Sequence, residues 1–244
     1  MRNIPIFVII TTFVANCSFA QSVIMDEDVF QDTLTPKNGP NYKNYFHWHF
    51  NYGLILGESE GSEADIMPGN SYNYQFGIRY KRKLAEFYAL GFELNFDHSS
   101  FRIAQNPGKT FITSILYDKQ KINSNKIELQ IYQRFNFGKR GNYMGKYLDL
   151  AGYGSWAFNV THYTMERNVT ANGYPQITET TYRGLTYVNP FIYGVAARLG
   201  FNKLAVYGKY RFSDMFRSFL LDGDTTTYPE LPRFIVGIEI GIIG

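Results

Sequence analysis

The sequence predicts an all-β fold: an eight-stranded antiparallel up-and-down transmembrane β-barrel of the outer-membrane type, with a polar and packed lumen. Bulky apolar residues alternate with small or polar residues in eight separate segments, which is the period of two expected for strands with one apolar face. The connections between these segments alternate between short and long, as they do in outer-membrane barrels. Aromatic residues make up 18% of the chain and there are 22 glycines, a composition that favours strands and tight corners over helices.

The individual strands follow from this alternation in chain order. In the first segment, Phe46, Trp48 and Phe50 alternate with two histidines and an asparagine. The next two segments repeat the pattern regularly, whereas Gln133 interrupts the apolar face of the fourth, where we expect a bulge. The remaining four return to the alternation and end on a glycine-punctuated run of isoleucines. We expect strands over residues 46–56, 72–81, 88–97, 127–137, 148–160, 191–199, 204–212 and 234–242.

The connections predict the orientation of the barrel. Short turns are expected around Lys83, over 138–145 and near Phe201. Between them lie four longer polar connections, which we expect to face outside while the short turns and both termini face the periplasm. These longer connections cover residues 57–70, 103–124, 163–186 and 214–231.

The N-terminus predicts export. Residues 1–20 combine an early arginine, an apolar middle and small residues flanking Phe19, the pattern of a secretory signal peptide. We expect a periplasmic extension over 21–43 and the barrel over 44–244. Cleavage after Ala20 would remove Cys17, so the mature chain would hold no disulfide or cysteine-ligated metal. The net charge of +3 favours no nucleic-acid partner, and no motif calls for a cofactor.

The alternation leaves open which face points outward. A soluble lipocalin-like ligand carrier would point its aromatic residues inward, whereas a membrane barrel points them toward lipid. The small size of the polar-face residues and the nearly balanced charges favour the membrane barrel, and we expect Arg134 and Asp149 to form an ion pair inside it. The charged residues expected in the lumen are Arg79, Lys81, Arg134, Arg198, Lys209 and Arg211, with Glu93, Asp97, Glu128, Asp149 and Glu239.

Two histidines lie on the inward face of the first strand. His47 and His49 are two residues apart and therefore point the same way, as metal ligands often do. Closing the barrel places the last strand beside the first, which brings Glu239 near one of them. We expect a hydrogen-bonded histidine–glutamate contact, and the alternative is a metal site formed by His47, His49 and Glu239.

One stretch resembles a catalytic motif. His98 and Ser100 share the lipid-facing side of the third strand, which resembles the His-x-Ser of eight-stranded lipid A deacylases of the PagL type. This resemblance implies a lipid hydrolase, with Ser100 as nucleophile and His98 as base. Those enzymes take an acidic third member from the following strand, whereas residues 109–117 contain no acid before Asp118. The alternative interpretation is a hydroxyl-rich strand end at the level of the lipid headgroups.

The expected loops carry two weaker patterns. The acidic loop with Glu58, Glu60, Glu63 and Asp65 is either solvated or shares divalent cations with lipopolysaccharide phosphates. The stretches 32–34 and 224–226 resemble the acidic-hydroxyl O-glycosylation sites of Bacteroidota. Outer-membrane lipid and lipopolysaccharide are therefore the expected partners.

The whole pattern resembles one known family. With a signal peptide, eight strands and the closing stretch "LPRFIVGIEIGIIG", the chain resembles the PorT-like outer-membrane barrels of Bacteroidota, which are Gram-negative. That resemblance implies an outer-membrane location and a structural or accessory role, and one family member is required for type IX protein secretion. The sequence therefore predicts a non-enzymatic outer-membrane protein whose further partners are secretion-system or other envelope proteins.

Overall fold

A computed structural model describes residues 39–57, 65–138, 141–169, 174–221, 224–226 and 228–243. The chain divides into two units, residues 1–35 and 36–244, and the first unit, with the predicted signal peptide, lies outside the described residues. No helix in the described part of the chain is long and apolar enough to cross a membrane. The strands are β1 (Asn44–Leu56), β2 (Tyr72–Lys83), β3 (Tyr88–Ile103), β4 (Lys119–Phe137), β5 (Lys146–Val169), β6 (Pro175–Arg183), β7 (Phe191–Phe201), β8 (Leu204–Arg211), β9 (Phe219–Leu221), β10 (Asp224–Thr226) and β11 (Phe234–Ile243).

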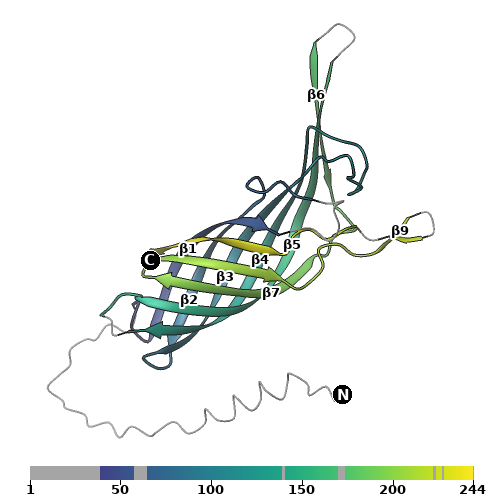
Figure 1. Cartoon of the computed structure of the whole chain (residues 1–244). Coiled ribbons are helices and arrows are strands. Elements are labelled where there is room, and N and C mark those ends of the chain that lie inside the picture. Colours follow the sequence, from purple (N-terminus) through teal and green to yellow (C-terminus); the bar gives the residue numbers. More distant parts are fainter. Residues whose placement is uncertain are drawn as a thin grey trace, which may run out of the picture. The chain divides into compact units, whose positions relative to one another are not determined.

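The second unit is built on one nine-stranded antiparallel sheet. The strand order is β4-β3-β2-β1-β11-β8-β7-β5-β6, and a further pairing between β4 and β5 joins the sheet into a ring (Figure 1). The first strand pairs with the last, with Trp48 opposite Ile242 and Leu54 opposite Val236. The all-β antiparallel prediction is confirmed.

The nine-stranded sheet contains one strand that the sequence did not predict. Residues 163–186 were expected to form a loop, but β5 continues to Val169 and β6 returns beside it as a two-stranded ribbon (Figure 1). The side chains of β6 are almost all exposed, so this ribbon needs no alternation of apolar and polar residues. Its threonines, tyrosine and isoleucine favour strand on propensity alone. β4 likewise begins at Lys119 and not at residue 127.

The connections follow the expected pattern at one end of the ring. β2 and β3 are joined by residues 84–87, and β7 and β8 by Asn202 and Lys203. Asn202 has a φ of 56°, the left-handed conformation that a tight two-residue hairpin requires and that asparagine tolerates. The β4–β5 connection lies at this end too, because Phe135 at the end of β4 is opposite Tyr88 at the start of β3. The connections that follow β1, β3 and β8 are longer and lie at the opposite end.

The two faces of the sheet differ sharply in chemistry. Along β1 buried and exposed residues alternate strictly through most of the strand, with His47, His49 and Asn51 buried and Phe46 and Trp48 exposed. The same holds around the ring, so the inside carries charged and polar side chains and the outside carries aromatic and aliphatic ones. The polar face therefore points into the ring, as predicted.

Candidate functional site

The interior of the ring holds an arginine–carboxylate cluster. Arg134 contacts Asp149 through two hydrogen bonds of 2.7 and 2.8 Å, which is the predicted ion pair. Arg79 donates to Glu93 at 2.7 Å and to both oxygens of Glu239 at 2.6 and 2.7 Å. Three positive and three negative side chains make this cluster neutral, and each is at least 96% buried: Arg79, Arg134, Arg198, Glu93, Asp149 and Glu239.

Arg198 connects the cluster across the interior. It lies on β7, and its guanidinium contacts Glu93 of β3 at 2.9 Å, Asp149 of β5 at 2.9 Å and Glu239 of β11 at 2.8 Å. One side chain therefore ties three different strands together. Buried charges are tolerated when they are paired and hydrogen-bonded in this way.

A lysine–carboxylate cluster lies next to it. Lys209 contacts Glu128 at 2.7 Å and Asp97 at 3.2 Å, and Lys126 contacts Asp97 at 2.8 Å. Gln75 bridges the two carboxylates, donating to Asp97 at 2.5 Å and to Glu128 at 2.9 Å. This cluster also balances two positive against two negative charges. Lys126 is a member that the sequence did not predict, because this strand was expected to begin at residue 127, one residue later.

Two of the predicted lumen residues, Arg211 and Lys81, contact residues outside the strands at the ends of the ring. Arg211 contacts Glu230 at 2.8 Å and the carbonyl oxygen of Leu231 at 2.8 Å, in the connection before β11. Lys81 donates to the carbonyl of Pro40 and lies over the ring of Tyr45. Glu230 could not be predicted as a partner because it lies in a connection with no strand periodicity.

The histidines are buried, but the predicted contact with Glu239 is not formed. Glu239 lies opposite Asn51 in the β1–β11 register, and both of its oxygens contact arginines. His49 instead lies 3.6 Å from Glu93 and 3.0 Å from the Asn95 side-chain oxygen. His47 stacks on Tyr45 at 4.7 Å, and neither of its ring nitrogens has a hydrogen-bond partner in the described part of the chain.

The structure does not assemble the alternative metal site. Among the described residues, no group of three or more histidine, cysteine, aspartate or glutamate side chains is arranged to hold a metal ion. His47, His49 and Glu239 share the interior, but the arginines take up the carboxylate that the site would need.

Interior tyrosines fill the space that glycines leave on neighbouring strands. A Cβ atom at Gly91 would overlap Tyr132, and one at Gly200 would overlap Tyr147. Tyr132 also lies between two arginines, with the Arg134 guanidinium 5.6 Å from its ring centre. Glycine on one strand thus lets an aromatic ring lie flat against the wall, which packs the narrow interior to high density.

The end of the ring with the long connections is closed by an apolar cap. All four connections contribute to it, and Phe111, fully buried, packs on Phe216 with ring centres 5.4 Å apart. Burial lowers the pKa of Lys109 next to Phe111, and three oxygens accept its hydrogen bonds. The cap consists of Ile55, Ile66, Phe101, Ile103, Phe111, Ile122, Val188, Met215, Phe216 and Leu231.

The opposite end is closed by a smaller cluster of Tyr45, Met144, Tyr147 and Ala205. Two cavities among the lumen residues measure about 10 and about 30 Å³, which is room for about one water molecule each. The described interior is therefore filled with side chains and offers no space for a small-molecule ligand.

The enzyme-like stretch at the end of β3 shows no nucleophile–base contact. His98 Nδ1 lies 2.6 Å from the side-chain oxygen of Asn125, and Ser100 donates to Asn123 at 2.8 Å. Each residue is therefore paired with an asparagine of β4. His98 is half-buried, but Ser100, which was expected to face lipid, is fully buried. The position opposite His98 in the following strand is Asn125, an amide and not an acid.

The remaining predicted loop features are mostly outside the described residues. This applies to Glu58, Glu60 and Glu63 of the acidic loop, to Asp32 and its neighbours, and to the extension up to residue 38. Asp224–Thr226 forms β10, which pairs with β9.

No protein-family model matches this sequence, and no curated protein is significantly similar to it.

Proposed function

We propose that this chain is an outer-membrane β-barrel with a sealed, charged interior, in which β1–β5, β7, β8 and β11 span the membrane and β6 extends outside it. The observation that carries the proposal is the distribution of chemistry: fully buried charges inside a ring whose outer face is aromatic and aliphatic. In water such an arrangement would expose a very large apolar surface. Lipid makes the same surface favourable.

The height of the apolar face supports this proposal. On β3 the outward residues are apolar from Tyr88 to Phe96, and on β4 from Ile127 to Phe137 apart from one glutamine. At a rise of about 3.4 Å per residue and a tilt of about 40°, these stretches span about 21 and about 26 Å along the ring axis. Outer-membrane barrels carry an apolar band of about 25 Å.

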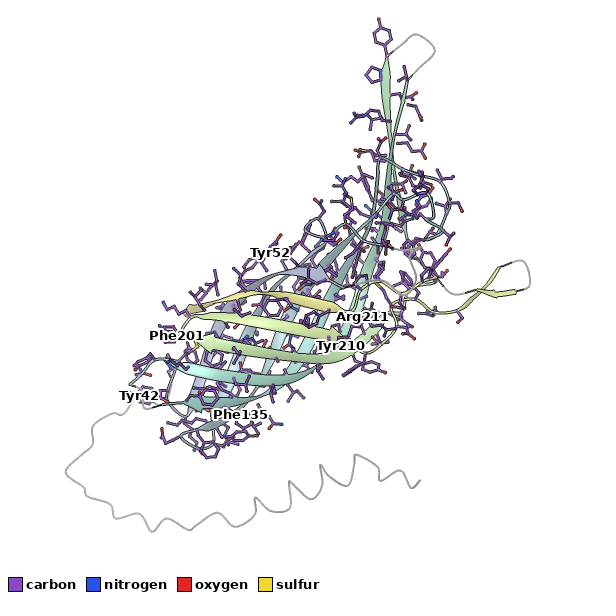
Figure 2. The ribbon with its side chains drawn as sticks, viewed as in Figure 1. Tyr42, Tyr52, Phe135, Phe201, Tyr210 and Arg211 are labelled. Atoms are coloured by element: carbon purple, nitrogen blue, oxygen red, sulfur yellow. The ribbon has the colours of Figure 1, made fainter. Side chains whose placement is uncertain are left out.

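Aromatic side chains lie toward both ends of this band. Tyr42, Phe135 and Phe201 lie toward the end with the short turns, and Tyr52 and Tyr210 toward the other end (Figure 2). Tyrosine and phenylalanine at two levels are typical of the girdles at the two membrane interfaces.

The sealed interior supports a structural or accessory role over transport of small solutes. The charge clusters and the caps at both ends leave no continuous path through the described residues. A soluble ligand carrier would need an apolar, hollow interior, which is the opposite chemistry. The function then resides in the surfaces outside the apolar band, which are formed by the connections that the apolar cap holds together.

The resemblance to the PorT-like family supports a more specific proposal, an accessory role in type IX protein secretion. Purification in mild detergent followed by identification of co-purifying proteins tests this. Recovery of secretion-system components is expected, and their absence would argue against the secretion role while leaving the barrel proposal untouched.

The barrel itself is tested by fractionation and gel mobility. We expect the protein in the outer-membrane fraction, migrating faster when unheated than after boiling. Planar bilayers containing it should show no steady conductance. Recovery in the soluble periplasm would overturn the proposal.

Lipid hydrolysis is a second candidate function, favoured by one observation. The side-chain oxygen of Asn125 lies 2.6 Å from His98 Nδ1 and orients the ring, so that Nε2 is the nitrogen left to contact a nucleophile, as in a catalytic histidine. Mass spectra of lipid A from cells with and without the gene decide it. A change in acyl chains that Ser100→Ala abolishes would establish the enzyme, and identical spectra would eliminate it.

A further inference from the structure

A groove forms where β5 exchanges one neighbour for another. β5 pairs with β7 up to Trp156, and Ala157 donates a final backbone hydrogen bond to Pro190 at 2.7 Å. It pairs with β6 only from Thr161 onward. Residues 158–160 therefore have no strand partner on this side in the described part of the chain. The groove that opens there has a volume of about 380 Å³, within the range of small-molecule sites.

The lining of the groove is suited to a phosphorylated polar group. Arg217 is exposed at its edge, and one guanidinium nitrogen donates to the carbonyl oxygen of Val188 at 3.1 Å. Its other donors contact no acceptor among the described residues, so they are available to a ligand. Asn159 and Thr186 add an amide and a hydroxyl to the lining. A guanidinium binds phosphate oxygens through two parallel hydrogen bonds, and the neutral groups suit sugar hydroxyls.

The groove lies at the upper limit of the apolar band. Phe158 lines it and is 47% exposed, with its ring 6.3 Å from those of Phe96 and Trp156 on the outer face. Immediately beyond Phe96 the outer face becomes polar, with His98 bonded to Asn125, which in turn lies opposite Asn159. An apolar wall below and a polar wall with a cation above match a lipid whose headgroup is a phosphorylated sugar.

We propose that this groove binds the phosphorylated sugar headgroup of a glycolipid in the outer leaflet. The inference rests on the proposed function, because that function places the groove at the headgroup level. Arg217 contacts the phosphate, Asn159 and Thr186 contact the sugar, and Phe158 lies against the first carbons of an acyl chain.

Native mass spectrometry of the full-length protein tests the site. The probes are lipid A, lipid A with both phosphates removed, and glucosamine 6-phosphate as a soluble headgroup. The wild-type protein should bind lipid A at least about tenfold more tightly than the dephosphorylated lipid, because a hydrogen bond to a charged group is involved. Arg217→Gln should lose this preference, and Arg217→Lys should keep part of it.

Two further variants serve as controls. Arg167→Gln removes an exposed cation of the ribbon, away from the groove lining, and should bind like the wild type. Asn159→Asp places a negative charge in the groove and should weaken binding of the phosphorylated lipid only. Glucosamine 6-phosphate binding as tightly as lipid A would support the site and assign its ligand to a soluble phosphorylated sugar.

Equal binding of both lipids by the wild type, or lipid A binding by Arg217→Gln at wild-type strength, would overturn the inference. Heat-modifiable migration is measured on the same samples, so a failure of membrane folding is separated from a failure of the site. A protein that folds in vesicles and shows no phosphate preference refutes the groove alone.

Discussion

The ion pair between Arg134 and Asp149 gives the sharpest test of the charged interior. Asp149→Asn keeps the shape of the side chain and removes one negative charge. Arg134 then loses the carboxylate it contacts at 2.7 Å, the only one within 4 Å of it among the described residues. Arg198 keeps its contacts with Glu93 and Glu239. Removing one partner of a buried pair costs about 3–5 kcal/mol, because the remaining charge stays buried without compensation.

Unfolding in urea of protein inserted in phospholipid vesicles measures this loss. With a slope of about 3 kcal/mol per M, the midpoint of Asp149→Asn should fall by about 1–1.7 M relative to the wild type. Trp48 and Trp156 are both on the outer face and about half exposed. Under the proposed function both tryptophans contact lipid, so their fluorescence should report unfolding through the loss of that contact.

The double variant Arg134→Met with Asp149→Asn separates charge from shape. It leaves no uncompensated charge, so we expect it to recover most of the midpoint, with an interaction energy of about 2–3 kcal/mol between the two sites. An unchanged midpoint in Asp149→Asn would refute the reasoning. So would a double variant whose loss of unfolding free energy equals the sum of the losses in Arg134→Met and Asp149→Asn measured separately.

Three further predictions concern the wall and the cap. Gly91→Ala should prevent folding or lower the free energy of unfolding by about 2 kcal/mol or more, because the new methyl overlaps a tyrosine ring and a backbone carbonyl; Gly152→Ala, with no atom within 4 Å, should migrate and unfold like the wild type. Phe111→Ala should open the cap at a cost of about 3–5 kcal/mol, seen as faster proteolysis of the connections, whereas the half-exposed Ile115→Ala should not. Burial lowers the pKa of Lys109 from 10.5, so between the lowered pKa and 10.5 the unfolded state binds more protons than the folded state. Resistance of the cap to proteolysis should therefore rise as pH increases toward 10.5 and fall as pH drops toward the lowered pKa. Lys109→Met should remove this pH dependence.

The sequence predicted the wall of the ring well because each strand of the wall has one apolar and one polar face. A period of two is visible whenever the two faces meet different surroundings. The Arg134–Asp149 pair was also predictable, because β4 and β5 are joined by a short turn and residues can be counted across it. The pairing of the first and last strands followed from closure of an even set of strands.

Contacts that cross the interior were not predictable in the same way. Arg79 reaches past β1 to Glu239, and Arg198 reaches Glu93 on a strand that is not its neighbour. Such contacts depend on side-chain length, on the width of the interior and on a register shift in β4–β5, none of which the alternation encodes. The β5–β6 ribbon escaped prediction for the opposite reason. Nearly all side chains of β6 are exposed, so no period distinguishes that strand from a polar loop.

The charges of the interior are better explained by specificity than by stability. Replacing a buried ion network with apolar residues of similar volume is often neutral or stabilising. An apolar interior would, however, give both faces of every strand the same character, and a slip of one residue would then exchange inside for outside at little cost. Arg79, Glu93 and Glu239 are fully buried, and Phe76, Leu94 and Ile240 are directed outward on the same strands. Any such slip therefore places charge on the apolar outer face, which the proposed function directs toward lipid. The two neutral clusters thus fix the register of the ring, and the small stability that they contribute is a secondary consequence.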